Sequence, residues 1–131
     1  MRRLAPLALI LLAGCGTEGA DLMVVERTGS IPGANLTLRV IDDGQVECNG
    51  VKHDLGSDQL IDAREVVREL ADPAKDRVSL PPGKPTILRF RIRIEDGVVG
   101  FSDTSPGQPK VFYEAAQLVR TIAKGACGLT R

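Results

Sequence analysis

The sequence lacks most of the residues that usually carry out chemistry. Its 131 residues include one histidine, three cysteines, one tyrosine, three phenylalanines and no tryptophan. A structural zinc site needs four ligands, usually Cys or His, and these residues are too few in the chain to supply them once Cys15 is set aside. The chain also has neither a glycine-rich phosphate loop nor a Gly-x-Ser-x-Gly motif. We therefore expect no metal site, no cofactor and no enzyme activity, and a core built from Val, Ile, Leu and Ala.

The chain also lacks an excess of charge of either sign. It holds 17 basic and 17 acidic residues, and loss of the first 14 residues would leave 15 basic against 17 acidic. Nucleic-acid binding depends on net positive charge. A nearly neutral, slightly acidic domain is therefore not expected to bind nucleic acid.

Long apolar runs are missing as well. The longest, residues 4–12, is interrupted by Pro6 and followed by glycines and by Glu18. A membrane-spanning helix needs about 20 apolar residues. A short cationic start, Met1-Arg2-Arg3, precedes the run, and small residues follow it. This order predicts a secretory signal peptide rather than a transmembrane helix.

The residues at the end of this run, Leu12-Ala13-Gly14-Cys15, resemble the lipobox of bacterial lipoproteins at every position. The resemblance covers the first fifteen residues. It implies that a diacylglyceryl group is attached to Cys15 and that cleavage occurs just before it. Two acyl chains are enough for stable membrane anchoring. The predicted location is the cell membrane or the outer membrane, facing away from the cytoplasm.

The expected organisation has three parts. Residues 1–14 form the signal peptide, residues 15–20 form the lipidated cysteine and a flexible tether of small and polar residues, and residues 21–131 form one small domain.

Two cysteines remain when Cys15 is assigned to the lipid. An even number of cysteines in an exported chain favours a disulfide, so we expect Cys48 to be bonded to Cys127. Free thiols are the alternative.

The first half of the predicted domain contains a strand, a hairpin and a helix. Residues 22–27 indicate a short strand. A three-residue turn at Asp42-Asp43-Gly44 would pair Val40 with Val46, Leu38 with Cys48 and Arg39 with Glu47. A helix then begins with Ser57 or Asp58 as its N-cap and ends at Asp72-Pro73. Its apolar stripe is Leu60, Ala63, Val67 and Leu70.

The second half repeats the pattern of hairpin and helix. Apolar residues alternate with arginines over residues 88–94, and a two-residue turn at Asp96-Gly97 would pair Ile94 with Val99. Residues 109–124 predict a helix with Pro109 in its first turn. We therefore expect an α+β fold: an antiparallel sheet built from two hairpins and the short N-terminal strand, with both helices on one face.

Two surfaces are candidates for binding. Arg89, Arg91 and Arg93 lie on one face of a strand and could hold an anionic protein or glycan, although a solvated face paired with acids such as Glu47 or Glu26 is the simpler interpretation. The second is the proline-rich loop of residues 81–85, which presents Lys84. A stiff loop loses little entropy when it binds.

The whole chain resembles the small uncharacterised lipoproteins of high-GC bacteria, which implies no activity. A fainter resemblance, in size, hairpins, helices and disulfides, is to the subtilisin-inhibitor-like proteins of actinobacteria. It implies an inhibitory loop at Lys84, but no cysteine flanks this loop. An enzyme using Asp103 or His53 is a further alternative. The favoured hypothesis is a membrane-anchored, non-catalytic binding or scaffold module.

Overall fold

The structure, a computed structural model, describes residues 19–131. The predicted signal peptide and the lipobox with Cys15 lie outside the described residues. The elements are β1 (Asp21–Gly29), β2 (Leu36–Ile41), β3 (Gln45–Cys48), β4 (Val51–Asp54), α1 (Ser57–Lys75), β5 (Leu88–Ile94), β6 (Gly97–Ser102) and α2 (Lys110–Lys124).

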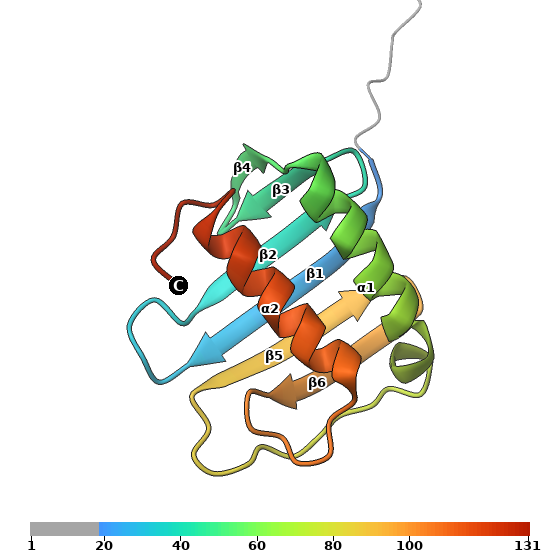
Figure 1. Ribbon diagram of the computed structural model, residues 1–131, viewed down its shortest axis with the longest axis vertical. Helices are drawn as coiled ribbons and strands as arrows, with labels where there is room; N and C mark the ends of the chain where they lie inside the picture. The colour runs from blue at the N-terminus through green and yellow to red at the C-terminus, as the bar shows by residue number, and fades with distance from the viewer. Residues whose placement is uncertain (1–18) are drawn as a thin grey trace, which may run out of the picture.

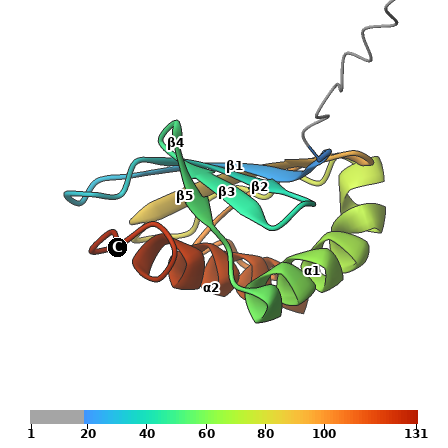
Figure 2. The same ribbon diagram turned by 90° about the horizontal axis from the view of Figure 1, so that it is seen from above.

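The strands form one antiparallel sheet in the order β4-β3-β2-β1-β5-β6. Both helices lie on the same face of this sheet, as Figure 1 shows from the helix side and Figure 2 from its edge. The predicted α+β fold with two helices on one face is thus confirmed. The opposite face carries no helix from the described part of the chain.

The N-terminal strand lies in the centre of the sheet. β1 pairs with β2 through Val25 and Leu38 and with β5 through Val25 and Ile92. Its inward residues Met23, Val25 and Arg27 are buried. β1 runs for nine residues instead of the six expected, because it pairs with β2 from Asp21 and with β5 as far as Gly29.

The first hairpin has the predicted register. Val40 pairs with Val46, Leu38 with Cys48 and Arg39 with Glu47. Gly44 has a φ of 92°, which glycine adopts without the steric cost that other residues incur.

The structure adds a fourth strand where the polar sequence Lys52-His53-Asp54 predicts a connection. β3 and β4 are joined by Asn49 and Gly50, both with positive φ, in a two-residue hairpin turn. Asn-Gly is among the strongest hairpin signals in a sequence. His53 therefore lies on an edge strand, opposite Val46.

The second hairpin differs from the predicted register. Its turn is Glu95-Asp96, so Ile94 pairs with Gly97 and Ile92 with Val99. This shift of two residues leaves every side chain on its expected face. Gly97 takes the first strand position because a Cβ there would lie 2.2 Å from the carbonyl oxygen of Ala74, where α1 passes close to the hairpin.

Helix α1 departs from prediction at both ends. Its N-cap is Gly56, without a side-chain cap, instead of Ser57 or Asp58. The helix also continues through Pro73, which removes only one backbone hydrogen bond in the last turn. The buried stripe consists of Ala63, Val66, Leu70 and Ala74, while Leu60 and Val67 are only partly buried.

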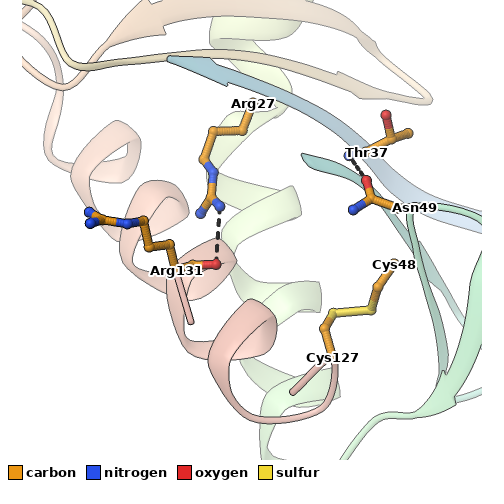
Figure 3. Close-up of a disulfide and its surroundings, with 6 residues drawn as sticks. All are labelled: Arg27, Thr37, Cys48, Asn49, Cys127 and Arg131. Carbon is orange, nitrogen blue, oxygen red and sulfur yellow. Dashed lines mark hydrogen bonds between the residues drawn. A yellow bond between two sulfur atoms is a disulfide. The ribbon is translucent and has the colours of Figure 1, made fainter. Parts of the chain in front are cut away.

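The predicted disulfide is present. Cys48 at the end of β3 and Cys127 after α2 are bonded, with Cα atoms 5.8 Å apart, and both residues are buried (Figure 3). The bond links the end of the helix layer to the sheet across 79 positions of sequence. It therefore holds α2 to the sheet in the folded protein, and it keeps the same two segments close together in the unfolded chain.

Replacing both Cys48 and Cys127 with serine should lower the free energy of unfolding by about 4 kcal/mol, because the cross-link restricts a loop of roughly 80 residues in the unfolded chain. Urea denaturation measures the change. The unaltered protein in reducing buffer should show the same decrease. An unchanged urea midpoint in both experiments would contradict this role of the disulfide.

Candidate functional site

Three arginines of β5 project from the sheet face that is opposite the helices. Arg89, Arg91 and Arg93 are all exposed and alternate with the inward residues Phe90 and Ile92. We call these three residues the arginine face. As the sequence predicted, the three side chains share one side of the strand, and their neighbours on β6 are Ser102, Gly100 and Val98.

Acidic side chains balance little of the positive charge of the arginine face. Arg91 lies 3.8 Å from Glu26 of β1, with both side chains more than half exposed, and such an exposed pair contributes at most about 1 kcal/mol. Arg89 and Arg93 make no ion pair within residues 19–131. Of the two acids expected to pair with these arginines, Glu26 does so.

The other expected acid, Glu47, pairs with a different arginine on the same sheet face. Arg39 donates hydrogen bonds to Glu47 at 2.8 Å and to Asp21 at 2.5 Å. The hydrogen bond with Glu47, followed by that with Asp21, raises the pKa of Arg39 above its ordinary value. The charge of Arg39 is therefore already balanced, in contrast to the charges of Arg89 and Arg93.

The proline-rich loop packs beside the end of β6. A Cβ on Gly83 would lie 2.1 Å from the carbonyl oxygen of Thr104, and Thr86 donates a 2.6 Å hydrogen bond to the carbonyl oxygen of Gly83. Lys84 is exposed on this loop. The disulfide is on β3, four strands away in the sheet, so it does not support the loop.

The two residues considered for catalysis lie apart. Asp103 accepts hydrogen bonds of 3.3 Å from the backbone N–H of Ile87, while His53 lies at the opposite edge of the sheet on β4. Within the described residues, no group of three or more His, Cys, Asp or Glu side chains could hold a metal ion.

The structure also contains a groove that no local pattern in the sequence predicts. A concave region of about 1240 Å³ borders both flanks of α2. On one flank it is lined by acidic residues of α1. On the other flank it is lined by the inner face of the sheet, including Leu88, Phe90 and Phe101. We call this second part the sheet cleft.

Arg27 lies at the base of the sheet cleft and is only 3% exposed. It donates from Nε to the carbonyl oxygen of Ala34 at 2.8 Å and from Nη2 to the backbone oxygen of Gly33. Nη2 also donates to the backbone oxygen of Arg131 (Figure 3). Burial lowers the pKa of its guanidinium. The alternation Met23, Val25, Arg27 already placed this arginine on the inward face, and that was the available sequence signal.

On the α1 flank, Glu69 and Glu114 are close enough to interact. A hydrogen bond with Glu114, followed by the charge of Glu114, raises the pKa of Glu69. Lys110 lies 3.1 Å from Glu114 and opposes this effect. The groove between the helices is therefore acidic, whereas Arg27 gives the sheet cleft a buried positive charge.

Comparisons of this chain with protein families, with curated proteins and with solved structures found no match. No helix within residues 19–131 is long and apolar enough to cross a membrane.

Glu69→Gln should raise the urea midpoint at pH 7 and leave it nearly unchanged at pH 3.5. A raised pKa in the folded state means that the folded protein holds this proton more tightly. The unfavourable contact with Glu114 therefore grows as pH rises through the pKa. Glu95→Gln, in the exposed hairpin turn, is the control and should show no such gain. A gain of equal size at both pH values would contradict the interaction.

Proposed function

We propose that this protein is a membrane-anchored, extracytoplasmic binding module without catalytic activity, and that the arginine face recognises an anionic protein or glycan. The observation that carries the proposal concerns residues 19–131: Arg89, Arg91 and Arg93 project from a sheet face that none of the described helices covers, and their ion-pair partner among these residues is Glu26.

The spacing of the arginine face suits a ligand with repeated negative charges. Residues two apart on a strand lie about 7 Å from each other, so the three guanidinium groups span about 14 Å. Each can hold a carboxylate, sulfate or phosphate with two hydrogen bonds. The small or apolar neighbours on β6 do not compete for these donors.

Two observations support a location outside the cytoplasm. The lipobox resemblance at Cys15 implies a lipid anchor, and buried disulfides such as Cys48–Cys127 are typical of oxidising compartments. The six residues 15–20 extend at most about 20 Å. The domain would therefore stay within about one domain diameter of the membrane, and its ligand would belong to the same envelope layer.

Cys15→Ser should abolish lipidation and prevent the cleavage that depends on it. The expected result is an uncleaved precursor, or a soluble form, without incorporated radiolabelled palmitate. Fractionation measures the location and cleavage of the protein, and palmitate labelling measures its lipidation. Cys48→Ser is the control and should still be lipidated. A Cys15→Ser protein that remains in the membrane fraction and is still cut before residue 15 would contradict the anchor.

The triple variant Arg89→Ser, Arg91→Ser, Arg93→Ser should lose the partner that the unaltered protein captures from envelope extract, because all three guanidinium donors are removed. Mass spectrometry of the captured material measures the loss. The matched control replaces Arg68, Arg77 and Lys124, three exposed cations off the arginine face, with serine. This control removes the same net charge and should retain the partner.

If both triple variants lost the partner equally, capture would depend on the net charge of the protein and not on the arginine face. Equal capture by the unaltered protein and the arginine-face variant would make these arginines a solvated surface without a recognition role. Circular dichroism, recorded before capture, tests whether each variant is folded.

A further inference from the structure

The sheet cleft has an apolar floor that leads to a buried cation. The cross-strand register places Arg27 opposite Phe90, and Phe90 opposite Phe101. Two strand spacings separate Arg27 from Phe101, so the apolar floor extends for about 10 Å. Phe101 stacks on Phe90 and on Phe112 of α2, with ring centroids 5.1 and 4.6 Å apart. The floor is therefore fixed before any ligand arrives.

Arg27 has one donor group that the chain does not use. Its hydrogen bonds come from Nε and Nη2, and Nη1 makes none. The described residues contain no side-chain nitrogen or oxygen that is both buried and without a partner. Because Nη1 has no partner, it must retain contact with solvent, and the solvent that Arg27 borders is the sheet cleft.

The charged residues are distributed unevenly around the sheet cleft. Arg120 of α2 and Arg131 line the same cleft as Arg27, and none of the three pairs with a side-chain carboxylate within residues 19–131. The cleft's acid, Asp103, follows β6 on the far side of β5 from Arg27 and is bound to the Ile87 N–H. One end is thus cationic, and the floor beyond it is apolar.

We propose that the sheet cleft binds an amphipathic anion, with a carboxylate or similar head at Arg27 and an apolar chain along Leu88 and Phe90. Nη1 of the buried Arg27 has no hydrogen-bond partner within residues 19–131, and an anion there would accept a charge-assisted hydrogen bond from it. The exposed apolar surface of Ala116, Ile31 and Tyr113 at the rim supplies further contact for the chain. This site is on the opposite face from the arginine face and is independent of it.

The test is an NMR titration of residues 19–131, the part of the chain that the structure describes, with decanoate below its micelle concentration. Decyltrimethylammonium, which has the same chain and a cationic head, is the matched ligand. We expect decanoate to shift the amide signals of residues 27–34, 88–90 and 116–120, and to bind at least about tenfold more tightly than the cation.

Two variants locate the binding. Ala116→Trp fills the cleft from the surface of α2 and should abolish decanoate binding while leaving the fold intact. Arg27→Gln should weaken it by about tenfold or more, but this residue also holds the loop at Gly33 and Ala34, so its fold is checked first. Arg93→Ser, on the opposite face, is the control and should bind decanoate normally.

Three outcomes would overturn the proposal: no binding of decanoate, equal affinity for decanoate and decyltrimethylammonium, or binding that Ala116→Trp leaves unchanged. None of these outcomes bears on the arginine face, because Arg89, Arg91 and Arg93 take no part in the cleft.

Discussion

Strand β1 forms backbone ladders with β2 on one side and with β5 on the other, and the two halves of the chain are joined through these ladders. A two-stranded hairpin alone is marginally stable in water. The sheet therefore depends on β1, which brings β5 and β6 beside the first three-stranded unit. This pairing also creates both candidate sites, because alternate residues of β1 point to opposite faces: Glu26 lies beside Arg91, and the next residue, Arg27, lies beneath the helices.

The two faces of the sheet are consequently very different environments. The helix side is closed by the apolar stripes of α1 and α2 and fastened by the bond between Cys48 and Cys127. Beside α2 lies the apolar sheet cleft with the buried Arg27. The other side is polar, and Arg89, Arg91 and Arg93 are exposed on it. The ion pair of Arg91 with Glu26 is weak, so these three arginines remain available for a ligand. The architecture thus separates a site for an apolar chain from a surface for repeated negative charges.

Local patterns in the sequence predict much of this fold. Alternation over residues 88–94 predicts the face of Arg89, Arg91 and Arg93, and the acidic-Gly turn predicts the register of the first hairpin, because both depend on neighbours in sequence. The misses depend on contacts between distant segments. Gly97 is set by the approach of Ala74, and Val66 rather than Val67 is buried because the direction of α1 is determined by its packing on α2 and the sheet. The sheet cleft could not be predicted, since its lining comes from both termini of the domain, from β5 and β6, and from α2.

Recognition of an anionic partner by the arginine face can be measured directly by an NMR titration of the domain with a sulfated oligosaccharide and, separately, with an acidic peptide. We expect at least one of them to shift the amide signals of residues 89–93 and of Glu26, and the signals of α1 and α2 to stay unchanged. Shifts confined to the helix side, or no shifts with either ligand, would contradict it.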